Sequence, residues 1–363
     1  MDNRFSFGPG PGYADGSYFD RPARREFITG LAALAASFLI PGRMSAQQVQ
    51  PSAPALLGWI DVHHHFAPPA YADILKQKSL TPSQLVGWSP QKTIEDMDRA
   101  GVQTAMNSIV GPGVWFDDPV QARRLARDSN EYAAKLMAGY PGRFGNFATL
   151  TLPDIDGSLH ELEYALDTLK ADGIMLFTSY NDKWLGDPFF APILEELNRR
   201  KAVLFVHPTT NACCANLLPG IPSAKIEYGT DTTRAIVRMV YSGASKRYPN
   251  IRTIFSHGGG TMPYLLTRFV NPHEGASGRD EPDFQAEVAK FYYDTAQTFN
   301  AIPMNALKHA VPMSQILFGT DYPYRSSKEN TMGLLAANVF DPQEFEALKR
   351  ENALGLLPGL KRP

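Results

Sequence analysis

Three consecutive histidines, His63-His64-His65, follow directly on an apolar segment near residue 60. In an extended chain, successive side chains point to opposite faces, so His63 and His65 share one face and His64 lies on the other. Imidazole nitrogen is a common ligand of Zn²⁺ and of other divalent ions. The spacing therefore predicts that His63 and His65 chelate one metal ion and that His64 lies outside its ligand set.

Three further residues that could bind metal or move protons end later apolar segments: His207 in VLFVHP, His257 in IFSHGGG and Asp321 in LFGTDYP. A single strand-end histidine is more often a structural residue, and a strand-end aspartate often caps the next helix. The coincidence at four segments favours one divalent metal site. Nitrogen and oxygen donors of this kind suit Zn²⁺, or a harder ion such as Mn²⁺. The expected metal ligands are His63, His65, His207 and Asp321.

The elements that must position these residues alternate between short apolar segments and helical patterns. Eight apolar segments of four to seven residues are expected strands: Trp59–Val62, Thr104–Val110, Phe144–Leu150, Gly173–Phe177, Val203–Val206, Arg252–Ser256, Phe291–Asp294 and Ile316–Thr320. Helical patterns such as Pro119–Gly139 and Asp231–Arg247 lie between them. This alternation predicts a parallel sheet, and eight units in about 300 residues fit an α/β fold of the (β/α)₈ TIM barrel type. An open doubly wound sheet is the alternative, although no GxGxxG motif follows the first segment.

Composition limits the class of protein. The 363 residues are 44% hydrophobic and 20% charged, with a formal net charge of −2, which is typical of a globular protein. The near-neutral charge argues against a nucleic-acid partner. Cys213 and Cys214 are adjacent. Consecutive Cα atoms lie only about 3.8 Å apart, below the usual disulfide range, so we interpret the two cysteines as free thiols.

The first 46 residues differ in composition from the rest of the chain. Residues 1–20 are rich in Gly, Asp and aromatic residues without a helical period, which predicts disorder. Arg24 and Arg25 then precede the apolar run Leu31–Ile40. At ten residues this run is too short to span a bilayer as a helix, which needs about 20 residues.

A paired arginine before a short, Ala-rich apolar run is typical of a twin-arginine export signal, here with cleavage near Ala46. An amphipathic helix in which the arginine pair is incidental is the alternative. We predict that residues 1–46 form a disordered tail and signal peptide, and that residues 47–363 form one barrel domain. The expected location is the periplasm, with no stable membrane anchor.

Four motifs resemble those of the amidohydrolase superfamily, in particular the branch of 2-amino-3-carboxymuconate-6-semialdehyde decarboxylase. They are DVHHHF, VLFVHPT, IFSHGGGTMPYLLTRF and FGTDYPY, and within the branch they look most like the 6-methylsalicylate decarboxylases. The resemblance covers about residues 58–358. It implies a barrel, one divalent metal ion, and non-oxidative decarboxylation of an aromatic or unsaturated acid.

The resemblance also implies roles for individual positions. The residues that match its metal ligands are His63, His65, His207 and Asp321. His257 matches the catalytic histidine, and Arg268 matches an arginine that crosses a dimer interface to hold a substrate carboxylate, so a homodimer is expected. Arginines that the semialdehyde enzymes carry before the motif MDRAGV are replaced here, where residues 92–96 read KTIED. A dicarboxylate substrate of that kind is therefore not expected.

Residue chemistry suggests how such a site would act. Loss of CO₂ from an aromatic acid leaves negative charge on a ring carbon, so the usual route protonates that carbon before the C–C bond breaks. A metal ion serves as Lewis acid and template, and either His257 or Asp321 supplies the proton. Arg268 is expected to hold an anionic group of the substrate. The aromatic residues expected to line a pocket for the ring are Trp115, Phe116, Tyr322 and Tyr324.

A metal-dependent hydrolase of the same superfamily is the main alternative. It would use a metal-bound water to attack a lactone, ester or amide, with His257 as the base. A non-catalytic binding protein is a second alternative, but it is expected to lose ligands or His257, and every position is filled here. We therefore predict a carboxy-lyase that acts on a small hydroxybenzoate-like or unsaturated carboxylic acid.

Overall fold

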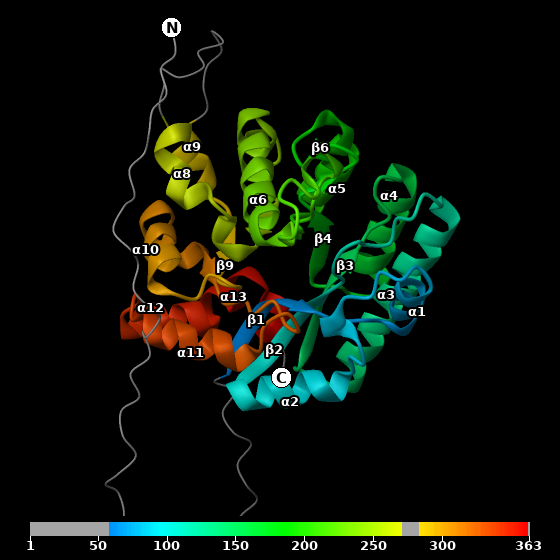
Figure 1. Cartoon of the computed structure of the whole chain (residues 1–363), viewed down its shortest axis with the longest axis horizontal. Coiled ribbons are helices and arrows are strands. Elements are labelled where there is room, and N and C mark those ends of the chain that lie inside the picture. The colour runs from blue at the N-terminus through cyan, green and yellow to red at the C-terminus, as the bar shows by residue number, and fades with distance from the viewer. Residues whose placement is uncertain (1–57, 271–282, 362–363) are drawn as a thin grey trace, which may run out of the picture. The chain divides into compact units, whose positions relative to one another are not determined.

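The computed structural model describes residues 58–270 and 283–361, and it confirms the expected barrel (Figure 1). Eight parallel strands form one sheet in the order β1-β2-β3-β4-β7-β8-β9-β10. Their bounds are β1 Trp59–His65, β2 Val102–Ser108, β3 Phe144–Thr149, β4 Gly173–Phe177, β7 Val203–His207, β8 Arg252–Phe255, β9 Tyr292–Asp294 and β10 Ile316–Leu317. Each of the eight expected strands overlaps one of these, so the alternation of apolar segments identified the sheet.

Hydrogen bonds between β1 and the chain that follows β10 close the sheet into a barrel. Val62 N donates to Phe318 O at 2.9 Å, and Asp321 N donates to His63 O at 2.8 Å. The chain after β10 therefore continues beside β1 although it is not a regular strand. This seam brings the two ends of the barrel sequence together at the histidine run.

Helices surround the sheet on its outer side (Figure 1). The longer ones are α1 Pro69–Gln77, α2 Pro90–Ala100, α3 Pro119–Gly139, α4 Ile155–Glu163, α5 Ala191–Arg200, α6 Ala224–Tyr241, α8 Met262–Phe269, α10 Ala301–Ala310 and α11 Ser327–Ala337. The shorter ones are α7 Ala244–Arg247, α9 Phe284–Val288, α12 Pro342–Glu346 and α13 Asn352–Leu356. A two-stranded antiparallel hairpin is formed by β5 Ser179–Tyr180 and β6 Lys183–Trp184.

Local sequence signals set where helices begin. Asp118 caps α3 by accepting hydrogen bonds from the Val120 and Gln121 amides, and Pro119 takes the first helical position. Proline suits that position because its missing N–H would have no helical partner there. A capping box starts α12: the side chain of Asp341 accepts from the backbone N–H of Glu344, and the side chain of Glu344 accepts from that of Asp341. These caps fix the ends of helices that carry the barrel loops.

The barrel interior is apolar along the strands and polar at their carboxyl ends. One buried apolar cluster includes Ile60, Met106, Phe147, Phe205, Ile254 and Leu317. The buried polar residues His63, His207 and Asp294 lie at strand ends. Side chains that bind or react are therefore held by a packed core, which fixes their backbone positions.

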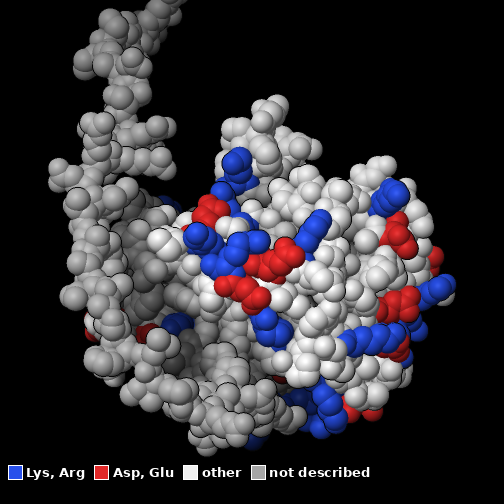
Figure 2. Space-filling view, turned by 90° about the horizontal axis from the view of Figure 1, so that it is seen from below, with Lys and Arg blue, Asp and Glu red and all other residues white. Residues whose placement is uncertain are grey.

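The outer surface carries charges of both signs. Basic and acidic side chains intermingle on the face shown in Figure 2, so the near-neutral net charge is distributed there as a mixture. No helix within residues 58–270 and 283–361 is long and apolar enough to cross a membrane. Cys213 and Cys214 are both free, as expected. The expected disordered tail and signal peptide over residues 1–46 lie outside the described part of the chain.

Candidate active site

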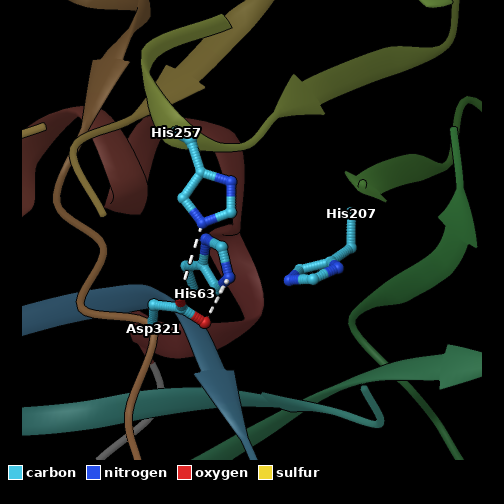
Figure 3. Close-up of side chains that lie close together, drawn as sticks. All are labelled: His63, His207, His257 and Asp321. Carbon is cyan, nitrogen blue, oxygen red and sulfur yellow. Dashed lines mark hydrogen bonds and ion pairs between the residues drawn. The ribbon is translucent and has the colours of Figure 1, made fainter. Parts of the chain in front are cut away.

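Side chains from β1, β7, the turn after β8 and the segment after β10 meet in one buried cluster (Figure 3). One donor atom from each of four residues lies within 4.8 Å of the others: His63, His207, His257 and Asp321. His65 joins them, because its Nε2 lies 3.2 Å from His63 Nε2 and 3.0 Å from Asp321 Oδ1. The five residues identified at the ends of apolar segments therefore lie together.

His64 lies outside this cluster, as strand alternation predicts. Its Nδ1 lies 3.0 Å from Asp61 Oδ2. Its ring stacks on Tyr322 with the centroids 4.7 Å apart. The side chain is fully buried, so His64 contributes to the packing of the barrel wall.

The spacing of the donor atoms fits a metal ion. Metal–nitrogen bonds of about 2.0–2.1 Å place neighbouring ligand atoms roughly 3.0–3.4 Å apart at tetrahedral or octahedral angles. The separations among His63 Nε2, His65 Nε2 and Asp321 Oδ1 are 3.2, 3.3 and 3.0 Å. Neither His207 Nε2 nor Asp321 Oδ1 makes a hydrogen bond within the described part of the chain, although both are buried. A divalent cation would satisfy these atoms together.

The electrostatics of the cluster also favour a cation. Burial lowers the pKa of His63, but Asp294 and Asp321 outweigh this effect and raise the pKa to about 10. Burial lowers the pKa of His65, and burial with repulsion from neighbouring imidazoles lowers the pKa of His207 strongly. Burial opposes ionisation of Asp321, but the surrounding histidines hold its pKa well below the usual range. The cluster thus combines a carboxylate, two neutral imidazoles and one cationic position that a metal ion can take over from a proton.

His257, one of the five residues of the cluster, has an unusual backbone conformation. Its φ is 53° and that of Asp321 is 62°, both in the left-handed region that residues with a Cβ rarely adopt. His257 Nε2 lies 3.4 Å from Asp321 Oδ2, and Gln297 Nε2 donates to the same oxygen. Oδ1 of Asp321 faces His63 and His65 instead. His257 is therefore placed on the outer side of the carboxylate, where an imidazole can hold or move a proton.

Asp294 is a site residue that the sequence analysis did not assign. Its Oδ2 lies 2.9 Å from His63 Nδ1, and its Oδ1 accepts a hydrogen bond from the His257 backbone N–H at 3.0 Å. The expected strand Phe291–Asp294 ends at this aspartate, just as another apolar segment leads to Asp321. The strand-end signal that identified Asp321 could therefore have identified Asp294.

A cavity of about 370 Å³ adjoins the cluster and is large enough for a small ligand. His207, His257 and Asp321 form part of its wall. The remaining lining residues include Val110, Lys225, Tyr228, Thr261, Gln297 and Tyr324. Burial raises the pKa of Tyr228 and Tyr324, so both present neutral phenols. The aromatic walls of this cavity come from α6 and from the segment after β10.

Three residues that are expected to bind substrate do not line this cavity. Trp115 donates from its Nε1 to Asp117 at 3.2 Å, and Tyr322 stacks on His64. Arg268 is exposed in the last turn of α8. None of the three is among the residues that line the cavity, whereas Tyr324 is. Substrate contacts by Trp115, Tyr322 and Arg268 stay predictions.

Comparisons with known proteins agree with the fold and the motifs. Decarboxylase yanB of Aspergillus niger is 38% identical over 325 residues, covering 84% of this chain and 88% of the relative. The 6-methylsalicylic acid decarboxylase of Penicillium expansum is 37% identical over 319 residues, covering 83% and 97%. A solved dihydroxybenzoic acid decarboxylase from Polaromonas, with bound manganese and the inhibitor 2-nitroresorcinol, has the same fold, with a TM-score of 0.72, 21% identity and coverage of 84% and 98%. Residues 60–359 match the amidohydrolase family, and this chain therefore belongs to that family.

Proposed function

We propose that this protein is a metal-dependent carboxy-lyase that removes CO₂, without oxidation, from a small hydroxybenzoate-like acid. The observation that carries the proposal is the buried cluster of His63, His65, His207, His257 and Asp321, which adjoins a cavity of about 370 Å³. A single aromatic ring with a carboxylate suits a cavity of this size. The two fungal relatives, both named as decarboxylases, support this reaction over hydrolysis.

The proposed ligands of the divalent ion are His63, His65, His207 and Asp321. When bound there, the ion supplies Lewis-acid stabilisation for the substrate carboxylate and an adjacent phenolate oxygen. Zn²⁺ and Mn²⁺ both accept such nitrogen and oxygen donors. The bound manganese of the Polaromonas enzyme supports Mn²⁺ as one candidate.

The proton that is added to the ring carbon would come from a residue of the chain itself. Asp321 Oδ2 already accepts a hydrogen bond from Gln297 Nε2, so this oxygen is engaged as an acceptor. His257 lines the cavity, and its buried Nδ1 makes no hydrogen bond to any described residue. We therefore assign proton delivery to the ring carbon to His257, with Asp321 holding the imidazole through its Nε2.

Protein loaded with Mn²⁺ or Zn²⁺ is expected to release CO₂ from hydroxybenzoates, and chelator-treated protein is expected to release none. The panel would compare 6-methylsalicylate, salicylate and 2,6-dihydroxybenzoate, with benzoate as the control that lacks the phenolic oxygen. CO₂ and the phenol product would be measured together, and lactones would be assayed in parallel for acid release. Acid release from a lactone without CO₂ from any hydroxybenzoate would contradict the lyase and support a hydrolase.

We further propose that the working unit is a homodimer in which Arg268 completes the site of the partner subunit. Arg268 is exposed at the end of α8 and has no ion-pair partner among residues 58–270 and 283–361. A planar guanidinium binds a carboxylate or phenolate through two parallel hydrogen bonds, which Lys cannot do. An exposed arginine that does not reach the cavity of its own chain is compatible with this role.

Mixing inactive Arg268→Ala with inactive His257→Ala, under conditions that exchange subunits, is expected to restore activity. Random exchange should return about a quarter of wild-type activity, because half of the dimers are mixed and each holds one intact site. Each variant exchanged with itself is the control. Absence of recovery despite demonstrated exchange would place Arg268 in the site of its own chain or outside the site.

Export to the periplasm is also proposed. It depends on Arg24, Arg25 and the apolar run Leu31–Ile40. An exported protein of this kind would be folded before transport, which suits a metal site that is assembled from distant parts of the chain.

A further inference from the structure

We propose that Asp294 is a positioning residue that couples the metal ligand His63 to His257 through a single carboxylate. Asp294 is fully buried at the end of β9. Its Oδ2 lies 2.9 Å from His63 Nδ1. Its Oδ1 accepts hydrogen bonds from the backbone N–H groups of His257 and Ala296, each at 3.0 Å. One side chain thus holds the ring of one site residue and the backbone of another; the inference rests on the proposed metal site.

The contact with Oδ2 determines which nitrogen of His63 faces the other ligands. An ionised carboxylate can only accept hydrogen bonds, so His63 Nδ1 must donate to Asp294. His63 Nε2 then points toward His65 Nε2 and Asp321 Oδ1, at 3.2 and 3.3 Å. A carboxylate behind a ligating imidazole fixes its tautomer and orientation and increases its basicity. Asp294 therefore prepares His63 to bind a cation.

The contact with Oδ1 holds the backbone of His257. The φ of 53° at His257 is unfavourable for a residue with a Cβ, and such conformations persist only where surrounding bonds hold them. The hydrogen bond to Asp294 is one of these bonds. Without it, the His257 ring would lose its fixed position relative to Asp321 and the cavity.

Gly319 shows how closely His63 and Asp294 are packed against each other. A Cβ at position 319 would lie only 2.9 Å from the Cβ atoms of both His63 and Asp294. Gly319 is not among the glycines with positive φ, so backbone conformation does not require it. Close approach of His63 and Asp294 does require it, because any side chain there would push the two apart.

Asp294→Asn is the most informative substitution, because an amide cannot accept hydrogen bonds at both of its ends. If the Asn oxygen accepts from the His257 backbone, the NH₂ group faces His63 Nδ1 and pushes the ring proton to Nε2, the nitrogen that must bind metal. If the amide is turned around, its NH₂ group opposes two backbone N–H groups. Either arrangement disturbs His63 or His257, so metal affinity and proton transfer should both suffer.

Calorimetric titration of the metal-free protein with Mn²⁺ tests the first half of this coupling. Asp294→Asn is expected to weaken Mn²⁺ binding about 10- to 100-fold while thermal unfolding stays cooperative. Asp231→Asn is the matched control, because Asp231 is equally buried but accepts from Ser179 and Trp184. Its Mn²⁺ affinity should equal that of the wild type. Unchanged affinity in Asp294→Asn, or an equal loss in both variants, would overturn the proposal.

Two further readouts separate this inference from the proposed reaction. In zinc-loaded wild-type protein, nitrogen-15 spectra of the histidines should show a proton on His63 Nδ1 that exchanges slowly with solvent. A proton missing from Nδ1 would refute the inference whether or not any variant folds. At saturating metal, Asp294→Asn should still turn over more slowly than the wild type, and full recovery of kcat would remove His257 from the coupling. The binding and spectroscopic results do not depend on which substrate the enzyme uses.

Discussion

Replacing both His63 and His65 by alanine is expected to remove the metal ion and abolish activity. The two Nε2 atoms lie 3.2 Å apart and both face Asp321 Oδ1. Without them only His207 and Asp321 remain of the proposed ligands, which is too few to hold a divalent ion against water. Elemental analysis should show one ion per chain in the wild type and almost none in the double variant.

His64→Ala is the matched control for this experiment, because it removes a buried imidazole from the same strand. His64 contacts Asp61 and Tyr322 and lies outside the cluster. This variant is expected to lose stability through lost packing but to keep one ion per chain. Retention of the full metal content by the double variant would contradict the ligand assignment.

His257→Ala is expected to keep its metal ion and to lose most of its activity. A positioned acid or base commonly contributes about 10²- to 10⁴-fold to a rate, so kcat should fall within that range. His257 contacts Asp321 at Oδ2, on the side away from His63 and His65, so the remaining ligands stay in place. The measurements are kcat and KM with a hydroxybenzoate, together with the metal content.

The metal content separates two roles for His257, because its donor atom also lies within 4.8 Å of the other three in the four-residue cluster. Loss of the ion from His257→Ala would make this histidine a ligand. Normal turnover would assign the proton step to another group. His309→Ala provides a control, since His309 is an exposed histidine on α10 and should leave both readouts unchanged.

The positions of the proposed ligands could be predicted because strand periodicity operates on local sequence. Alternation along β1 placed His63 and His65 on one face and His64 on the other, and the structure agrees. Tyr322 lies beside His64 for a different reason: the chain after β10 runs parallel to β1 there, and the two residues form an isolated β-bridge. The place of Tyr322 next to Asp321 in the sequence predicts a pocket role, but its ring packs on His64 instead.

Other parts of the site depend on tertiary contacts that no local pattern encodes. Tyr228 on α6 lines the cavity with its ring centroid 5.9 Å from that of His207, although it lies 21 positions after His207 in the sequence. The expected strand Ile316–Thr320 is shortened to Ile316–Leu317, and the chain after it bonds to Val62 and His63 of β1 without forming a regular strand. A periodic pattern cannot show where such long-range bonds replace the regular ladder.

The seam between β1 and the chain after β10 also bears on how the barrel assembles. His63 and Asp321 are 258 positions apart, so the ion would join nearly the whole length of the barrel sequence into one loop. Such a bond acts as a reversible cross-link: binding to the folded state alone adds stability that grows with the ratio of metal concentration to dissociation constant. Because closing a long loop carries an entropic cost, contacts across the seam are entropically more costly to form than contacts between strands that are neighbours in the sequence. Metal availability would then set how much the bound ion adds to the stability of the folded barrel.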